Sequence, residues 1–168
     1  MFKVPPAMPF HLRPATAADV PLILQLVRDL AAYEKLSHEV EATEEKLRAA
    51  LFPASGPATA ECLLAFAEDN APAGFAVYFT NYSTFLAQPG LYLEDLFVRP
   101  GFRGRGIGKA LLLHVARLAN QRGCGRMEWT VLDWNETALA FYQKLGATVR
   151  PDWRICRLTG PALERYRE

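Results

Sequence analysis

The sequence has little that would place the chain in a membrane, in a disulfide-rich secreted class or around a metal ion. Its three cysteines are widely spaced and form no C-x-x-C pair, so neither a disulfide framework nor a structural zinc site is indicated. No stretch reaches the roughly 18 consecutive apolar residues of a membrane span, and the first ten residues contain no signal-peptide core. We therefore expect a cytoplasmic protein with reduced thiols and no metal.

The chain also lacks a strong charge of either sign. Nineteen basic and 18 acidic residues give a net charge of +1, which indicates no general attraction to nucleic acids or anionic membranes. A basic recognition helix is missing as well, because the predicted helix at 110–122 carries only Arg117 and Arg122 besides one histidine. We therefore expect neither nucleic acid nor membrane as a partner, and any recognition by charge must be local.

What the sequence does have is enough apolar material for one core. Hydrophobic residues make up 51% of the 168 positions, and a chain of this length is too short for two ordinary domains. We predict a single domain over residues 10–168, preceded by a proline-rich N-terminal extension at residues 1–9.

Hydrophobic periodicity and turn residues predict ten elements in the order βααβββαβαβ. This order describes an α/β fold with a mixed sheet and helices on both faces. Because the middle strands pair antiparallel, the fold also has α+β character. The strands are expected at 10–13, 62–68, 73–81, 91–98, 126–132 and 153–158, and the helices at 17–33, 43–51, 107–122 and 135–145.

A glycine-rich loop at residues 103–108 lies between a predicted strand and a predicted helix. Glycines allow a tight turn, and the N–H groups at a helix N-terminus bind anions, so a diphosphate is the expected ligand. A Walker loop would need Lys where the chain has Ile107, and a dinucleotide fingerprint would need Gly where it has Leu111.

The run Arg103-x-x-Gly106-x-Gly108 resembles the acetyl-CoA signature Q/R-x-x-G-x-G/A of the GNAT superfamily. The resemblance extends over most of the chain and is strongest to the diamine (spermidine/spermine) and thialysine acetyltransferases. Besides the loop, the segments that carry it are Ala32-Tyr33-Glu34, Tyr92-Leu93-Glu94-Asp95, Val131-Leu132-Asp133-Trp134-Asn135-Glu136, Phe141-Tyr142 and Gly146-Ala147.

The resemblance implies a GNAT-like acyl-CoA N-acyltransferase fold and a homodimer, which an aromatic-rich C-terminal portion at 153–166 also favours. It implies an N-acetyltransferase that moves acetyl from acetyl-CoA to a primary amine of a small molecule, which would be a polyamine, a diamine or a thialysine- or lysine-like compound. The coenzyme contacts that it implies are Leu96, Phe97, Val98, Arg103, Gly104, Arg105, Gly106, Ile107, Gly108, Lys109, Asn135, Ala138, Tyr142 and Lys144.

Acetyl transfer requires an unprotonated amine, although an alkylamine with a pKa near ~10.4 is protonated at neutral pH. Glu94, in the strand before the glycine loop, is our predicted proton acceptor, and Asp95 is expected on the opposite strand face. Tyr142 lies two helical turns after Asn135 and is our predicted proton donor to the departing thiolate. The predicted acceptor-binding residues are Tyr33, Glu34, Glu94, Asp95, Glu128 and Trp153.

Two alternatives stay open at this point. A peptide or protein N-acetyltransferase would share the coenzyme loop, although an acidic pocket of Glu34, Glu94 and Glu128 favours a small cation. A non-catalytic acyl-CoA-binding regulatory module would not need Tyr142. The loop at 150–153 is less acidic than its counterpart in the polyamine enzymes, so the sequence leaves the amine undefined.

Overall fold

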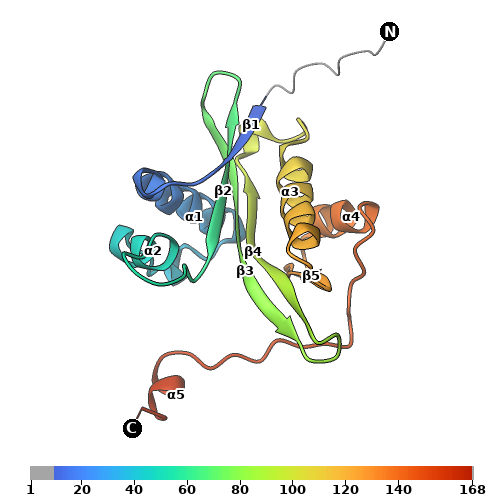
Figure 1. Ribbon diagram of the computed structural model, residues 1–168. Helices are drawn as coiled ribbons and strands as arrows, with labels where there is room; N and C mark the ends of the chain where they lie inside the picture. The colour runs from blue at the N-terminus through green and yellow to red at the C-terminus, as the bar shows by residue number, and fades with distance from the viewer. Residues whose placement is uncertain (1–9, 168) are drawn as a thin grey trace. The chain divides into compact units, whose positions relative to one another are not determined.

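The computed structural model of the chain describes residues 10–167 (Figure 1). Its internal contacts divide the chain into two compact units, residues 1–130 and 131–168. The predicted N-terminal extension, residues 1–9, lies outside the described residues.

The first unit contains all the strands of the described chain, and the second contains two helices. The elements of the first unit are β1 (Phe10–Pro14), η1 (Ala17–Asp19), α1 (Val20–Glu34), η2 (Ser37–Glu39), α2 (Glu44–Leu51), β2 (Glu61–Ala67), β3 (Pro72–Ser83), β4 (Gln88–Val98), η3 (Pro100–Phe102), α3 (Ile107–Gln121) and β5 (Arg126–Glu128). Those of the second are α4 (Glu136–Lys144) and α5 (Pro161–Glu164).

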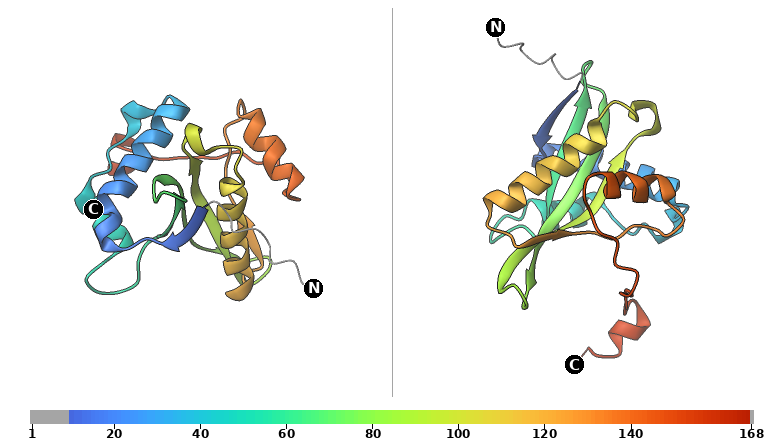
Figure 2. Two further views of the ribbon diagram at one scale, coloured as in Figure 1. Left: turned by 90° about the horizontal axis from the view of Figure 1, so that it is seen from above. Right: turned by 90° about the vertical axis from the view of Figure 1, so that its right-hand side faces the viewer.

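The sheet of the first unit is mixed, with the five strands in the order β1-β2-β3-β4-β5. Strands β1 to β4 pair antiparallel, whereas β4 and β5 pair parallel. A parallel pair needs a crossover, which α3 provides. Helices α1 and α2 cover one face of the sheet and α3 covers the other (Figures 1 and 2). The predicted mixed sheet with helices on both faces is confirmed.

The residues around α1 determine where this helix begins and ends. The Asp19 carboxylate accepts hydrogen bonds from the Thr16 backbone N–H at 2.7 Å and from both terminal nitrogens of Arg13 at 2.7 and 2.8 Å. These bonds hold the pKa of Asp19 well below its usual range, the contact with Arg13 contributing most. At the other end Lys35 adopts a left-handed backbone (φ 62°), so Tyr33 and Glu34 occupy the last turn of α1.

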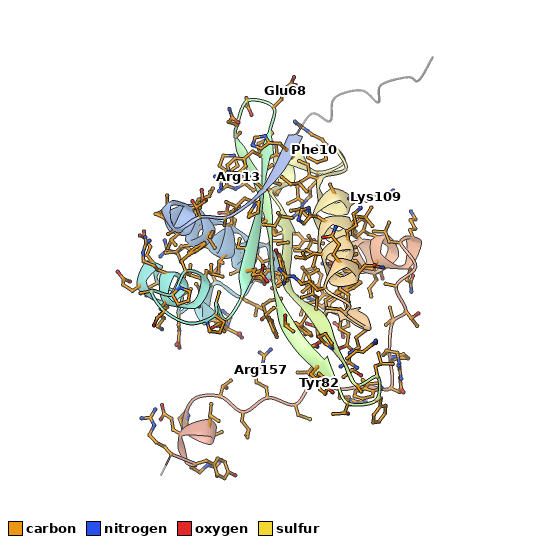
Figure 3. The ribbon with its side chains drawn as sticks, in the orientation of Figure 1. Phe10, Arg13, Glu68, Tyr82, Lys109 and Arg157 are labelled. Atoms are coloured by element: carbon orange, nitrogen blue, oxygen red, sulfur yellow. The ribbon has the colours of Figure 1, made fainter. Side chains whose placement is uncertain are left out.

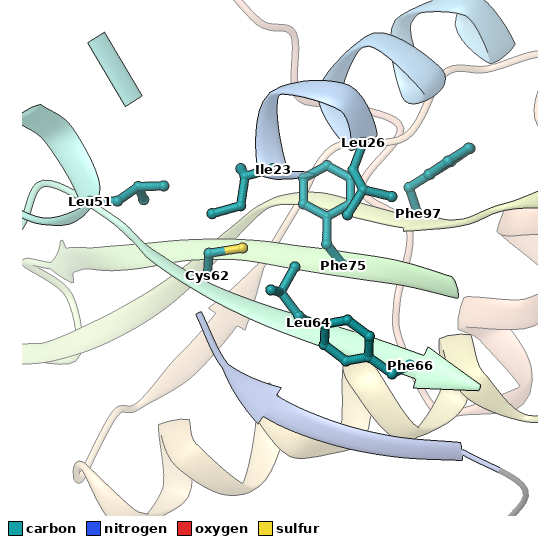
Figure 4. Packing of buried hydrophobic residues seen from close by; sticks show 8 residues of the cluster. All are labelled: Ile23, Leu26, Leu51, Cys62, Leu64, Phe66, Phe75 and Phe97. Carbon is teal, nitrogen blue, oxygen red and sulfur yellow. The ribbon is translucent and has the colours of Figure 1, made fainter. Parts of the chain in front are cut away.

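The core beneath α1 and α2 joins these helices to the strands (Figure 4). Its buried members are Ile23, Leu26, Leu51, Cys62, Leu64, Phe66, Phe75 and Phe97. Burying one side chain of this kind contributes about 1.5 to 3 kcal/mol to stability. Burial also raises the pKa of the Cys62 thiol to about 12, with smaller contributions from the charges of Asp95 and Asp19. Cys62 is therefore a structural thiol, not a nucleophile.

Two strand predictions are wrong. The strand predicted at 126–132 ends at Glu128, and residues 153–158 form no strand. The apolar residues of 153–158 alternate as in a strand, yet a strand also needs a neighbour for its N–H and C=O groups. The unit that contains them has no other strand between 131 and 167. Trp153 and Ile155 are accordingly 71% and 68% exposed.

The predicted helices are found with small shifts at their ends. Asn135 caps α4 by accepting a hydrogen bond from the Ala138 N–H at 3.2 Å, which makes Glu136 the first helical residue. No helix between residues 10 and 167 is long and apolar enough to cross a bilayer.

Candidate active site

A bulge in β4 determines how its acidic residues are presented. Asp95 pairs with Val77 of β3, while the next residue of β3, Tyr78, pairs with Leu93. Glu94 is therefore an extra residue in β4, and strict alternation of side chains is interrupted there. Val77 packs against the core beneath α1, so its pairing partner Asp95 lies on the face of the sheet that α1 covers.

Three carboxylates gather around this bulge. Glu94 is exposed and Asp95 is half-buried, and Glu34 reaches the cluster from the last turn of α1. Burial, reinforced by the charges of Glu94 and Glu34, raises the pKa of Asp95 to about 7. Burial also raises the pKa of Glu34. Because carboxylates that repel one another gain from a nearby cation, this cluster is suited to an ammonium group.

β4 has an open edge on the side away from β3. β5 pairs only with Gly90, Leu91 and Tyr92, so it leaves Leu93 to Val98 without a parallel neighbour in the first unit. An extended ligand can hydrogen-bond to such an edge in the manner of an added strand. The sequence-predicted coenzyme contacts Leu96, Phe97 and Val98 lie on this stretch.

The glycine loop adopts the conformation expected of an anion site. Gly104 and Gly106 have left-handed backbones (φ 75° and 84°), and Gly106 is the N-cap of α3. Residues other than glycine rarely adopt this backbone, so both glycines are needed for the turn. The first N–H groups of a helix 15 residues long therefore point out of the loop. Together with the helix dipole they favour a bound anion.

Cationic side chains flank the start of α3. A cavity of about 360 Å³ there is lined by Arg105, Lys109 and Arg117, and also by Phe10 of β1; Figure 3 labels Phe10 and Lys109. Arg105 donates a hydrogen bond to the Gly101 carbonyl at 3.0 Å, which closes the loop. Arg105, Lys109 and the helix terminus are thus suited to phosphate groups.

Arg103, at the beginning of the loop, is held by three neighbours. Its Nε donates to the Val98 carbonyl at 2.8 Å. Its guanidinium carbon lies 4.4 Å from the ring centroid of Tyr33 and 5.7 Å from that of Phe97. The structure thus brings together Tyr33, which the sequence predicts to contact the acceptor amine, and Arg103, which it predicts to contact the coenzyme.

Glu128 has partners of its own within the first unit. Its carboxylate lies 2.9 Å from the Arg126 Nε and accepts a hydrogen bond from the Asn81 side chain at 3.3 Å. Arg126 therefore compensates the charge of Glu128. Neither Asn81 nor Arg126 was predicted from the sequence, in which they are 45 residues apart and no motif connects them.

The remaining predicted site residues belong to the second unit. Tyr142 and its neighbour Phe141 are half-buried in α4, with ring centroids 5.3 Å apart. Lys144, in the last turn, is exposed. Trp153 lies 5.8 Å from the Arg150 guanidinium. The Oδ1 of Asn135 is engaged with Ala138 as the helix cap, so a capping function of Asn135 adds to its predicted contact with the coenzyme.

The chain has relatives over most of its length. The acetyltransferase (GNAT) family model matches residues 25–147. The chain belongs to the acetyltransferase (GNAT) family. It is 36% identical to an L-ornithine N5-acetyltransferase of Arabidopsis thaliana, covering 92% of this chain and 86% of that protein. It is 40% identical to a thialysine N-epsilon-acetyltransferase of Bos taurus, covering 90% and 94%.

Solved structures give the same result for the fold. An integron cassette protein from the mobile metagenome of V. cholerae superposes with a TM-score of 0.76 at 25% identity, over 95% of this chain and 98% of that one. The predicted family, its diamine and thialysine acetyltransferase branch and the GNAT-type fold are confirmed. The protein is an N-acetyltransferase of the GNAT type, and acetyltransferases of this family use acetyl-CoA as cosubstrate.

Proposed function

We propose that this enzyme acetylates a primary amine of a small molecule with more than one charge, of the ornithine, lysine or thialysine class, using acetyl-CoA. The observation that carries the proposal is the group of three carboxylates, Glu34, Glu94 and Asp95, at the β4 bulge next to the coenzyme loop. Relatives that act on ornithine and thialysine support the same class of acceptor.

Electrostatics favours a cationic acceptor over a neutral peptide terminus. An ammonium group placed among the carboxylates would relieve their mutual repulsion and lower the pKa of Asp95 from about 7. A small diamine or amino acid offers one ammonium to be held and a second amine to be acetylated. We assign Glu34 and Asp95 to holding the charge, with Glu128 and Trp153 as further predicted residues around the acceptor.

We assign the proton transfers to Glu94 and Tyr142. Glu94 accepts a proton from the substrate ammonium, which frees the nitrogen lone pair to attack the thioester carbonyl. The tetrahedral intermediate then loses its remaining ammonium proton to solvent, its C–S bond breaks, and the Tyr142 hydroxyl gives a proton to the thiolate. Tyr142 regains a proton from solvent and Glu94 releases its own, so that the products are the acetylamide, coenzyme A and one proton. The exposure of Glu94 in β4 supports the first assignment, and the family resemblance supports the second.

The coenzyme site that we propose follows from the loop geometry. The α3 N-terminus with Arg103, Arg105 and Lys109 would hold the diphosphate and the remaining phosphate. The open edge of β4 at 96–98 would bind the pantetheine arm as an added strand. Asn135, Ala138 and Lys144 of α4 are the further contacts that the family resemblance implies.

We infer that both units belong to one acetyltransferase domain, since the family match at 25–147 crosses the boundary at residue 130.

We also propose a homodimer in the cytoplasm. Exposed apolar side chains of the second unit support the dimer: Trp153, Ile155, Leu158, Leu163 and Tyr166. Three free cysteines among residues 10–167 agree with a reducing compartment. Light scattering at micromolar concentration should give twice the 18.8 kDa chain mass, and a single chain mass would contradict the dimer.

An acceptor screen tests the proposed function. Coenzyme A release from acetyl-CoA is measured with ornithine, lysine, thialysine, spermidine, aminoglycosides and lysine-containing peptides at equal concentrations. We expect the highest kcat/KM with ornithine, lysine or thialysine. Preference for peptides would identify a peptide N-acetyltransferase, and acetyl-CoA binding without turnover on any amine would identify a regulatory module; either result would overturn the proposal.

A further inference from the structure

We propose that Tyr33 is a positioning residue of the coenzyme site, which holds the guanidinium of Arg103 against the end of α1 in a conformation ready for the diphosphate. This role rests on the proposed function, in which Arg103 binds the coenzyme. It differs from contact with the acceptor amine, which the sequence predicts for Tyr33.

The contacts of Arg103 fix the conformation of its side chain. An arginine side chain on an exposed loop samples many rotamers, and fixing it costs conformational entropy when a ligand binds. Here the guanidinium lies over the face of Tyr33 at 4.4 Å, with Phe97 at 5.7 Å. The Nε–H is used by the Val98 carbonyl at 2.8 Å. Cation–π attraction at such distances is worth enough to select one conformer before the ligand arrives.

A second contact one helical turn earlier keeps α1 and the loop in register. The Asp29 carboxylate accepts a hydrogen bond from the Arg99 Nε at 2.7 Å, and Arg99 also donates to the Pro72 carbonyl at 3.0 Å. Asp29 and Tyr33 are four residues apart on one face of α1. Their partners Arg99 and Arg103 are four residues apart at the entrance to the loop. The helix therefore holds this segment at two points.

Tyr33 lies between the coenzyme loop and the carboxylate cluster. Its neighbour Glu34 is close enough to Asp95 for its charge to raise the pKa of that group. Its ring also packs against Phe97, with ring centroids 6.2 Å apart, and Phe97 belongs to the strand that we assign to pantetheine. The last turn of α1 thus touches the elements that serve both substrates, and Tyr33 touches the coenzyme side.

Coenzyme A affinity of the full chain, measured by calorimetry without any amine, tests this role, because an acceptor contact cannot change that quantity. Arg103→Ala should weaken binding about tenfold to a hundredfold. Tyr33→Leu, which removes the ring, should weaken it about threefold to tenfold, whereas Tyr33→Phe, which keeps the ring, should stay within about twofold. The matched control Tyr82→Leu, at a tyrosine that is 60% exposed in β3, should leave affinity unchanged.

The double variant separates positioning through Arg103 from a general structural effect. If Tyr33 acts through Arg103, then Tyr33→Leu should cost less than about twofold once Arg103 is alanine. Equal losses in both backgrounds, or no loss in the single variant, would overturn the role of Tyr33 and leave the proposed function intact. Failure of the unaltered chain to bind coenzyme A would overturn the proposed function itself. Circular dichroism checks the fold of each variant, and Tyr33→Met replaces Tyr33→Leu if the latter does not fold.

Discussion

The two halves of β4 have different neighbours and different contents. Residues 88–92 lie between β3 and β5, whereas residues 93–98 pair with β3 alone. The first half includes Leu91, which is fully buried. The second contains the bulge, Glu94, Asp95 and the strand end that leads into the glycine loop. Both halves contribute buried side chains, Leu93 and Phe97 in the second, but only the second half also has a backbone edge and carboxylates available to ligands.

The difference between the two halves shows that ligand-binding groups can lie on a strand of the central sheet where one of its edges is unpaired. A strand paired on both sides has its N–H and C=O groups occupied, so it contributes stability but cannot bind an extended ligand. Ending β5 at Glu128 frees one edge of β4, and the bulge brings an additional carboxylate to the free half. The predictions below ask whether stability and activity separate between these halves.

We call residues 88–92 of β4, which are paired on both sides, the closed half and residues 93–98 the open half. The largest effect is expected in the closed half, from Leu91→Ala. Deleting a fully buried leucine leaves a cavity and should lower the free energy of unfolding by about 2 to 5 kcal/mol. The matched substitution in the open half, Leu96→Ala, removes a half-buried side chain and should cost about 1 kcal/mol or less. Denaturant titrations measure both values, and equal losses would show that Leu96 is packed as tightly as Leu91.

Glu94→Gln should have the opposite effect, because it changes activity and leaves stability nearly unaltered. Loss of the proton acceptor should lower kcat at pH 7 about a hundredfold to a thousandfold. Part of the loss should be recovered as the pH rises toward the amine pKa, since solvent then supplies unprotonated amine. Glu68→Gln, at an exposed turn labelled in Figure 3, is the control and should behave like the unaltered enzyme. A pH profile parallel to that of the unaltered enzyme would leave Glu94 with binding alone.

Tyr142→Phe tests whether acetyl transfer also depends on a side chain outside β4. Removing one hydroxyl should lower kcat about a hundredfold, at the low end of general acid catalysis, because thiolates are already fairly stable leaving groups. The KM for acetyl-CoA should change little, since the hydroxyl is needed only as charge develops on sulfur. Steady-state kinetics with acetyl-CoA and the best amine measure both values, with Tyr166→Phe as the control. An unchanged kcat would show that Tyr142 is not the proton donor.

Local signals were sufficient for much of the fold and for the coenzyme loop. The periodicity of α1 and the asparagine at the N-cap of α4 act over a few residues, so their elements could be read from the chain. The glycine spacing at 103–108 predicted a tight turn before a helix, and Gly104 and Gly106 form it with left-handed backbones. In each case the residues that predict the helix or turn are the same residues that form it.

Features that depend on distant neighbours were missed. The bulge at Glu94 is defined by the register between β3 and β4, so it could not be predicted from alternation along β4 alone. Residues 153–158 have the composition of a strand and no strand partner in their unit. The pairing of Arg126 with Glu128, and of Tyr33 with Arg103, likewise depends on geometry that no short motif encodes.

The smallest expected effect concerns Asp95, where stability and function in the open half conflict. Its pKa in the folded protein is about 7, above the ordinary value of 3.8, so the folded chain binds this proton more tightly than the unfolded chain does. The contribution of Asp95 to stability is therefore present below about pH 4 and is lost as the pH rises to 7. Asp95→Asn removes the buried charge, so it should raise the free energy of unfolding by about 1 to 2 kcal/mol at pH 8 and have little effect at pH 4.5. Denaturant titrations at both pH values measure the difference, with Asp133→Asn, at an exposed position, as the control. A difference between Asp95→Asn and the unaltered protein that is the same at both pH values would show that burial and the charges of Glu94 and Glu34 do not act on Asp95 as described.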